Sequence, residues 1–480
     1  MNGTTILWSM ALFLSAITIA EANQSRTSKP NIIVIISDDA GHADFSLHGS
    51  KTFRTPHIDS LAKGGVHCST GYVSASVCSP SRAGLMTGRY QQRFGHEFNI
   101  PPKYSETNGL PVNEQTIADL MKAAGYRTIA LGKWHLGYAP HFHPLSRGFD
   151  DYFGFLQGAR SYWPIKGTKL NQLLRDRKPI PEKFTYMTDE LGKQAARYIA
   201  ENRKRPFFLY LSFNAVHTPM HAKEQDLKQF QQLKNVSRQK LAAMTKALDD
   251  AVGTVMAALD EHNLRDNTLV IFINDNGGAQ SNSSNNLPLR GWKGTPFEGG
   301  LRVPFIMRWP DRLPAGNRYP HPVISLDILP TALAAAGATK MPKKKLDGVN
   351  LLPYLTGKKV DRPHRTLHWR KGPNFAVRDG DWKLLRHKNE MMLFDLAKDP
   401  RESVNLIEKE SERANALLKT YKTWEAELMD PRWNSKRKKK KKGKKMSAMF
   451  YDSEIKKREF HGQQWRSPFL FREKILLSTM

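Results

Sequence analysis

Cysteine is scarce in this chain, which has only Cys68 and Cys78 among its 480 residues. Two cysteines cannot form the disulfide framework that stabilises many small exported proteins. They lie ten positions apart, so a single small disulfide loop remains possible. A chain of this length can bury enough apolar surface to fold without such bonds, and we expect it to divide into two domains.

Acidic residues are also few, with 45 Asp and Glu against 74 Lys and Arg, which gives a formal net charge of +29. Residues 432–480 carry +12 of this charge and include the block SKRKKKKKGKKM. A basic protein attracts polyanions, such as nucleic acid, anionic lipid, or sulfated or carboxylated polysaccharide. The charge by itself does not select among these partners.

Long apolar runs are missing after the N-terminus, so we expect no integral membrane span in the mature chain. Residues 6–20 are apolar and lead to Ala20-Glu21-Ala22, a pattern that predicts a signal peptide over residues 1–22. The first five residues lack Lys and Arg, so an uncleaved anchor is the alternative. The prediction is export to the periplasm or the extracellular space, or to a lysosomal-type compartment if the source is eukaryotic.

Apolar, β-rich runs alternate with helical patterns over residues 30–340. The runs are 31–37, 127–131, 206–213 and 268–273, and the helical patterns are 113–125, 188–202 and 238–263. Continuous apolar runs are typical of strands that are buried on both faces. The alternation therefore predicts an α/β domain with a large, mostly parallel central sheet flanked by helices.

The pattern changes after residue 340. Residues 366–370, 374–387 and 391–396 indicate antiparallel strands, with a hairpin at Asp379-Gly380, and a helix is expected over 405–429. We therefore predict a smaller C-terminal α+β domain over 341–431, with an antiparallel sheet. The basic tail, 432–480, is predicted to be disordered. It is either a polyanion-binding arm or an extension without a role.

Oxygen-bearing side chains follow two of the predicted strands. Asp38 and Asp39 come after the first, and Asp275 and Asn276 come after the strand at 268–273. Because parallel strands place their sites at their carboxyl ends, we expect these residues to meet. Adjacent carboxylates need a counter-charge, and oxygen ligands favour Ca²⁺ or Mg²⁺ over zinc. The structural alternative is a helix cap and an Asx-turn.

Cations and imidazoles occupy the remaining strand ends and loops. They are Arg82, Lys133, His135, His217 and Lys293. A single loop Lys or His is more often a solvated surface residue, but five together could form a pocket for a tetrahedral oxyanion, with the histidines as acid and base.

Residues 78–82, Cys-Ser-Pro-Ser-Arg, followed by AGLMTGRY, resemble the signature of the type I sulfatases, the formylglycine-dependent branch of the alkaline phosphatase superfamily. The segment GKWHLG, the His-Thr-Pro loop, the Asp-Asn-Gly-Gly turn and the Lys-Gly-Thr…Glu-Gly-Gly…Arg-Val-Pro run match that family in order. The resemblance covers about residues 30–430. It implies an alkaline-phosphatase-like fold and hydrolysis of sulfuric esters.

The resemblance implies that Cys78 is oxidised to formylglycine (3-oxoalanine) by a formylglycine-generating enzyme, which argues against a Cys68–Cys78 disulfide. Cys68 is then a small buried residue. The implied metal is Ca²⁺ rather than Mg²⁺, with ligands Asp38, Asp39, Asp275, Asn276 and the modified Cys78. The implied catalytic roles are orientation of the nucleophile by Arg82, sulfate binding by Lys133 and Lys293, protonation of the leaving oxygen by His217, and assistance to sulfate release by His135.

Several loop residues could contact the leaving alcohol, although each could equally be ordinary surface packing. They are His96, His141, His143, Arg160, Trp163, His221 and Arg290. The excess positive charge favours a sulfated polysaccharide, either carrageenan-like or a glycosaminoglycan, from which sulfate is removed in exo or endo mode. The alternatives are a phosphate or phosphonate ester hydrolase of the same superfamily, an inactive protein that binds sulfated glycans, and a surface- or nucleic-acid-binding protein acting through its tail. We expect no nucleic-acid partner.

Overall fold

The computed structural model describes residues 29–166 and 170–434. The predicted signal peptide and residues 435–480 of the predicted tail lie outside this part of the chain. Three residues assigned to the tail, 432–434, are described, and two of them are held by hydrogen bonds. Arg432 donates a hydrogen bond to the Thr107 carbonyl, and the buried Trp433 donates one to the Phe98 carbonyl. In the described ranges, no helix combines the length and apolarity that crossing a membrane requires.

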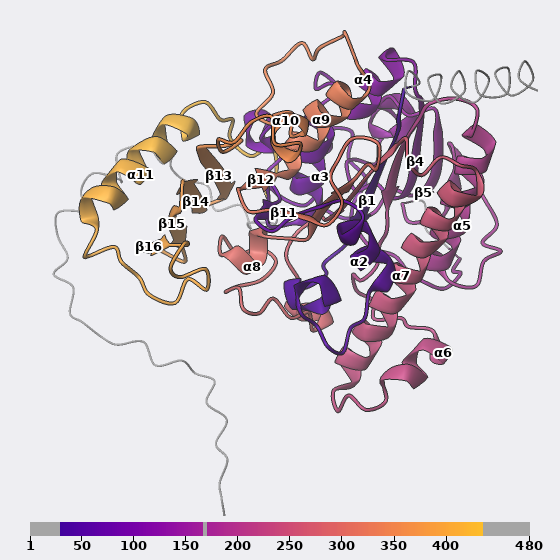
Figure 1. The fold of residues 1–480 in the computed structure, drawn as a ribbon, viewed down its shortest axis with the longest axis horizontal. Helices are drawn as coiled ribbons and strands as arrows, with labels where there is room; N and C mark the ends of the chain where they lie inside the picture. Colours follow the sequence, from indigo (N-terminus) through magenta and orange to yellow (C-terminus); the bar gives the residue numbers. More distant parts are fainter. Residues whose placement is uncertain (1–28, 167–169, 435–480) are drawn as a thin grey trace, which may run out of the picture. The chain divides into compact units, whose positions relative to one another are not determined.

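In this part of the chain, a ten-stranded sheet lies at the centre of the fold (Figure 1). Its five parallel strands, in sheet order, are β9 (Thr268–Asn274), β1 (Asn31–Ser37), β8 (Phe207–Ser212), β4 (Arg127–Lys133) and β5 (Asp151–Phe155). Beyond β9 lie β10 (Phe305–Arg308), β2 (Val66–Cys68) and β11 (Asn317–Tyr319), and beyond β5 lie β6 (Leu174–Arg175) and β7 (Lys178–Pro179). The predicted large, mostly parallel sheet is confirmed.

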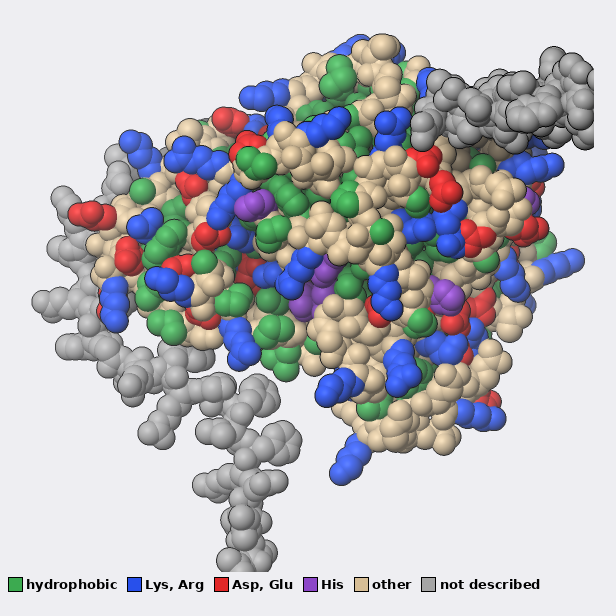
Figure 2. Space-filling model, viewed as in Figure 1, with side chains coloured by type: hydrophobic (Ala, Val, Ile, Leu, Met, Phe, Trp, Pro, Cys, Tyr) green, Lys and Arg blue, Asp and Glu red, His purple; other side chains and the backbone are tan. Residues whose placement is uncertain are grey.

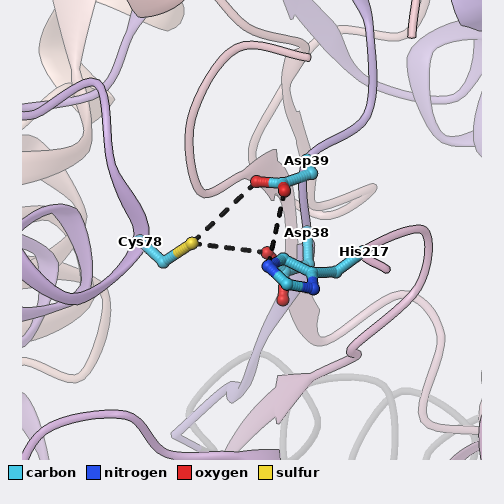
Figure 3. Close-up of side chains that lie close together, drawn as sticks. All are labelled: Asp38, Asp39, Cys78 and His217. Atoms are coloured by element: carbon cyan, nitrogen blue, oxygen red, sulfur yellow. Dashed lines mark hydrogen bonds and ion pairs between the residues drawn. The ribbon is translucent and has the colours of Figure 1, made fainter. Parts of the chain in front are cut away.

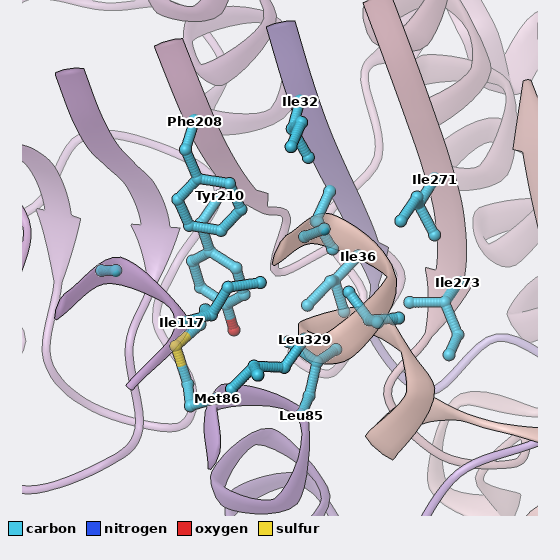
Figure 4. Close-up of a cluster of buried hydrophobic side chains, with 14 of the residues drawn as sticks. Ile32, Ile36, Leu85, Met86, Ile117, Phe208, Tyr210, Ile271, Ile273 and Leu329 are labelled. Carbon is cyan, nitrogen blue, oxygen red and sulfur yellow. The ribbon is translucent and has the colours of Figure 1, made fainter. Parts of the chain in front are cut away.

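Helices cover both faces of this sheet. One face carries α3 (Cys78–Thr87), α4 (Ile117–Ala123) and α9 (Ile328–Ala335), and the other carries α2 (Pro56–Lys63), α5 (Met187–Asn202) and α7 (Val236–Glu261). On β1, Ile32 and Ile36 belong to the first apolar cluster (Figure 4), whereas Ile33 and Ile35 belong to the second. Because side chains alternate along a strand, burial on both faces requires the continuous apolar run.

Two helices begin later than predicted. Helix α4 begins at Ile117 instead of 113, because Thr116 and Asp119 form a capping box that closes its N-terminus. Helix α11 (Ser411–Glu425) begins six residues after the predicted start at 405. There, Asn405 accepts hydrogen bonds from the backbone of Leu393 and of Ile407, which holds this segment against a strand.

The predicted antiparallel sheet is confirmed as four strands in sequential order. They are β13 (Thr366–Lys371), β14 (Asn374–Asp379), β15 (Trp382–His387) and β16 (Glu390–Asp395). The hairpin at Asp379-Gly380 joins β14 to β15, and Gly380 has the positive φ of 59° that such turns favour. Residues of this sheet and of α11 form one apolar cluster.

A buried ion triad links the four-stranded sheet to the helix α8 (Glu298–Leu301), which precedes β10 in the chain. Lys383 on β15 donates to Glu298, the first residue of α8, at 2.8 Å and to Glu402 at 2.9 Å. All three side chains are almost fully buried. Burial would raise the pKa of Glu298, but the charge of Lys383 outweighs it and brings this pKa to about 2. Buried charges of this kind are tolerated only while their partners remain.

We predict that Lys383→Met destabilises the chain, because it leaves two buried carboxylates without their cation. The free energy of unfolding, measured by chemical denaturation, should fall by about 3–5 kcal/mol. The matched control is Lys398→Met, which removes a lysine that is 86% exposed and pairs with Asp395 on β16. This change should cost less than about 1 kcal/mol. Equal stability of the two variants would show that the triad does not hold the four-stranded sheet to α8.

Candidate active site

The carboxyl ends of the central parallel strands meet at one edge of the sheet, and the predicted residues follow them directly. Asp38 and Asp39 extend β1, Asp275 and Asn276 extend β9, Lys133 ends β4, and His217 lies in the loop after β8. Backbone hydrogen bonds between Asp38 and this loop, to Ala215 and from Val216, hold the loop beside β1. The sheet topology therefore gathers residues that are up to 238 positions apart.

Helix α3 directs Cys78 into this group (Figure 3). The Sγ atom lies 3.7 Å from Asp38 Oδ1, 3.9 Å from Asp39 Oδ1 and 3.0 Å from Lys293 Nζ. Ligand atoms of Cys78, the two aspartates and His217 all lie within 4.8 Å of one another. Both cysteines are free, and Cys68 is buried on β2, as expected. Burial and the charge of Asp275 raise the pKa of the Cys78 thiol to about 12.

Three buried carboxylates are paired with three cations. The pairs are Arg82–Asp275, Lys133–Asp38 and Lys293–Asp39, with nitrogen–oxygen distances of 2.8, 2.5 and 2.6 Å. Burial would raise the pKa of Asp38, but the charges of Lys133 and its cationic neighbours outweigh it and hold this pKa well below its usual range. Burial and the charge of Asp38 instead raise the pKa of Asp275. This crowding would be relieved by a further cation.

Asn276 supports a site for a metal cation. Its Nδ2 donates to Asp39 at 2.8 Å, whereas its buried Oδ1 receives no hydrogen bond within the described residues. A buried carbonyl oxygen normally has a donor or a metal partner. Together with three carboxylates it forms an all-oxygen set of the kind that hard divalent cations prefer. The residues present therefore fit such an ion.

Two residues of the site have left-handed backbone conformations. Asp39 has a φ of 62° and His135 a φ of 58°. Such values are uncommon outside glycine, and they concentrate at functional sites when the surroundings hold them. The Asp39 carbonyl is held by hydrogen bonds from Asn282, at 3.1 Å, and from Ser284, at 2.9 Å.

The two histidines are oriented by different contacts. His217 Nδ1 lies 2.6 Å from the Thr218 carbonyl, so this nitrogen carries a proton, and Nε2 lies 3.5 Å from Asp39 Oδ2. The His135 ring packs on Gly158, where an added Cβ would lie 2.4 Å from the ring. Burial and the charge of Lys133 hold the pKa of His135 well below its usual value, so its imidazole is neutral.

Several supporting residues were not predicted. Ser79 donates its backbone N–H to Asn99 and its hydroxyl to the His135 carbonyl, which fixes the start of α3. Ser212 accepts a hydrogen bond from Arg82, and Tyr162 donates to the carbonyl of His217 at 2.8 Å. Ser212 could have been predicted, because it is a polar residue at the end of an apolar strand. No local pattern marks Tyr162.

Three of the predicted substrate contacts are occupied elsewhere. His96 is fully buried, and its Nε2 lies 2.7 Å from Ser79 Oγ. His143 accepts a hydrogen bond from the Leu145 N–H at the start of a short 3-10 helix. Arg160 is buried and pairs with Glu182 at 2.6 Å. Each of the three still has one nitrogen without a hydrogen-bond partner among the described residues, so a role in substrate binding stays a prediction.

The other four lie at the surface or in structural contacts. His141 lies 2.9 Å from the Glu106 carbonyl, and Arg290 donates to the Glu402 carbonyl and lies over the Phe297 ring. The rings of Trp163 and His221 are nearly parallel, 6.5 Å apart. Trp163 also lines a surface cavity of about 370 Å³ with Tyr186, Lys193 and Lys223.

Two family models match the chain. The model described as Sulfatase matches residues 30–338, and the model described as N-sulphoglucosamine sulphohydrolase, C-terminal, matches residues 292–425. The first covers more than half of the sequence and includes every residue of the candidate site.

Relatives and solved structures agree with these matches. The N-acetylgalactosamine-6-sulfatase of Canis lupus familiaris is 33% identical over 401 residues, which cover 78% of this chain and 75% of the relative. Arylsulfatase A of Bos taurus is 32% identical over 477 residues, with coverages of 87% and 90%. The structure of Ps i-CgsB in complex with k-i-k-neocarrahexaose is 38% identical, with a TM-score of 0.81 and coverages of 85% and 95%. The chain therefore belongs to the sulfatase family and is a sulfuric ester hydrolase.

Proposed function

We propose that this sulfatase removes sulfate from a sulfated polysaccharide or its oligosaccharides, using a formylglycine derived from Cys78 and a Ca²⁺ ion. The position of Cys78 carries the proposal. Its Sγ lies within 4 Å of Asp38 and Asp39 and 3.0 Å from Lys293 Nζ. A side chain at this point reaches both the oxygen ligands of a cation and a cation that would hold an anionic substrate.

The charge balance of the site supports an anionic substrate. The three carboxylates and three cations of the site offset one another. A divalent ion held by Asp38, Asp39, Asp275 and Asn276 would leave the site positive, and a sulfate ester would bring the compensating negative charge. The all-oxygen ligand set favours Ca²⁺ or Mg²⁺ over zinc, and the family resemblance implies Ca²⁺. When bound, the ion would stabilise negative charge on oxygen.

The remaining residues have roles that follow from their contacts. The hydrated formylglycine would supply the hydroxyl that attacks sulfur, and Arg82, fixed by Asp275, would orient it. Lys133 and Lys293 would bind sulfate oxygens. His217, whose Nε2 lies 3.5 Å from Asp39 Oδ2, would protonate the leaving oxygen. The neutral His135 would assist sulfate release.

A carbohydrate leaving group is supported by three observations. The N-acetylgalactosamine-6-sulfatase relatives carry a sugar in their name, and a structure at 38% identity holds a neocarrahexaose. Next to Lys293, the Trp292 side chain is 43% exposed, and an exposed indole offers a face for a sugar ring. Figure 2 shows Lys and Arg side chains spread over the visible face of the molecule, a distribution that suits a polyanionic glycan.

The proposal includes export of the chain, by the predicted signal peptide, to the periplasm or the extracellular space. It also includes a formylglycine-generating enzyme as the partner that modifies Cys78. This residue is almost fully buried at the start of α3, so the modification must precede complete folding.

We predict that the peptide containing Cys78 loses about 18 Da when the chain is produced with a formylglycine-generating enzyme, because one oxygen replaces sulfur and two hydrogens. The measurement is mass spectrometry of the digested protein. The peptide containing Cys68 is the internal control, and its mass should not change. An intact Cys78 thiol in chain that the modifying enzyme has processed would contradict the proposal and favour a glycan-binding protein.

We predict that His217→Ala lowers kcat by about 10²–10⁴-fold on a sugar sulfate, because the leaving alkoxide is no longer protonated. The loss should be much smaller on 4-nitrophenyl sulfate, whose phenolate leaves without a proton. Sulfate release is measured for both substrates. The control is His57→Ala, at an exposed histidine of α2, which should retain kcat. An equal loss on both substrates would exclude a general-acid role.

We predict that Asp38→Asn weakens Ca²⁺ binding by at least about tenfold, because the number of ligand charges sets the affinity of such sites. Titration calorimetry on the chelator-treated protein measures the change directly. The exposed Asp311→Asn is the control and should bind like the unaltered chain. Sulfate release should stop after chelation and return with Ca²⁺ more fully than with Mg²⁺. Unchanged binding in Asp38→Asn would place the ion elsewhere.

A further inference from the structure

A lysine from the four-stranded sheet reaches the rim of the proposed active site. Lys371 is the last residue of β13, and its Nζ donates to the Gly294 carbonyl at 3.3 Å. Gly294 directly follows Lys293, whose Nζ contacts Cys78 Sγ at 3.0 Å. The end of β13 thus brings Lys371 against the residue that follows Lys293, although the two lysines are 78 residues apart in sequence.

Lys371 lacks the acidic partner that Lys293 has. Lys293 is paired with Asp39, but within residues 29–166 and 170–434 no carboxylate oxygen lies within the 4.0 Å ion-pair distance of Lys371 Nζ. Its side chain is partly buried, and the neighbouring charge that acts on it is that of Lys293. Burial and this positive charge lower the pKa of Lys371. A partly buried cation beside a like charge is unfavourable unless an anion accompanies it.

The position of Lys371 is fixed by its neighbours in the chain. The buried Glu97 accepts hydrogen bonds from Arg370, at 2.8 Å, and from the backbone of Gly372, at 2.6 Å. Glu97 is therefore engaged on both sides of Lys371. The same loop carries Asn99, which accepts from the backbone N–H of Ser79 in the first turn of α3. The turn that presents Lys371 is thus anchored to the loop that positions the start of α3.

We propose that Lys371 is the cation of a second anion subsite, which lies beside the sulfate pocket and takes a sulfate or carboxylate group of the same glycan. The inference rests on the proposed function and narrows its substrate class. A substrate with a second anionic group close to the sulfate that is removed would pair with Lys371 and offset its repulsion with Lys293. A lysine suits this position, since its ammonium carries three rotatable donors on a long stem.

The test is a binding measurement on the unconverted chain, in which Cys78 is still a thiol. The probes are carrageenan tetrasaccharides that carry either two sulfates or one sulfate on each disaccharide, titrated by calorimetry. We expect the disulfated probe to bind about tenfold or more tightly than the monosulfated probe, as one charge-assisted hydrogen bond provides. In Lys371→Met the ratio of the two affinities should fall to nearly one, and Lys371→Arg should retain most of the preference for the disulfated probe.

The control is Lys398→Met, at an exposed lysine of the C-terminal region, which should keep the full preference. Circular dichroism and denaturation of each variant show whether its fold is intact, and Lys371→Arg tests the charge if Lys371→Met folds poorly. An unchanged preference in Lys371→Met would overturn the subsite. So would an unaltered chain that binds both probes equally or binds neither.

Sulfate release by the converted enzyme separates this inference from the proposed function. If the enzyme releases sulfate but its preference for the disulfated probe does not depend on Lys371, the subsite is refuted and the sulfatase proposal stands. If the preference for the disulfated probe depends on Lys371 but the enzyme releases sulfate from no sulfated glycan, the subsite is supported as a binding site and the proposed hydrolysis is refuted.

Discussion

The burial of three carboxylates at one edge of the parallel sheet is the constraint on which the site depends. Asp38, Asp39 and Asp275 have almost no exposed surface, so each must be compensated. The compensating cations come from α3, from the end of β4 and from the loop around Lys293, segments that are far apart in sequence. The ion pairs that assemble the site therefore also hold these segments in register.

This arrangement links stability to function. Loss of Arg82 leaves Asp275 unpaired, and loss of Lys133 leaves Asp38 with only Arg82, at 3.6 Å, so either substitution would be expected to affect folding as well as chemistry. The site also contains unfavourable features that folding alone does not require. Asp39 and His135 have left-handed backbones, and the Asn276 Oδ1 atom receives no hydrogen bond from any described residue. Such features are retained when a bound ion or substrate makes use of them.

The fold was largely predictable because its central strands are buried on both faces. Residues 31–37 and 268–273 form continuous apolar runs, which are typical of strands buried on both faces and uncommon in other elements. The polar residues that end these runs could then be assigned to one edge. Helix boundaries were less predictable, because α4 and α11 begin where particular side-chain hydrogen bonds form. Asn405 holds its segment against β16, a contact that no local pattern reveals.

The candidate site divides in the same way. Residues in motifs or at strand ends were found, whereas those that support them through contacts across the fold were not. Tyr162 acts on a loop that lies 55 residues further along the chain. The substrate contacts were hard to assign from sequence for a related reason. Arg160 looks available in sequence, yet Glu182 neutralises it, and His96 is buried behind the start of α3. Whether a loop cation is free depends on partners that only the folded chain identifies.

The four-stranded sheet bears on the choice of substrate. The paired carboxylates and cations of the candidate site gather at one edge of the parallel sheet and come from its strand ends, from α3 and from nearby loops. The smaller sheet is held by the triad at Lys383, which reaches Glu298 on α8, and by the contact of Arg370 with Glu97 in the loop before α4. Lys371 directly follows Arg370 at the end of β13. It has no carboxylate partner in the described chain. If Lys371 binds a second anionic group as proposed, the smaller sheet contributes to the choice of substrate without altering the ion pairs around Cys78.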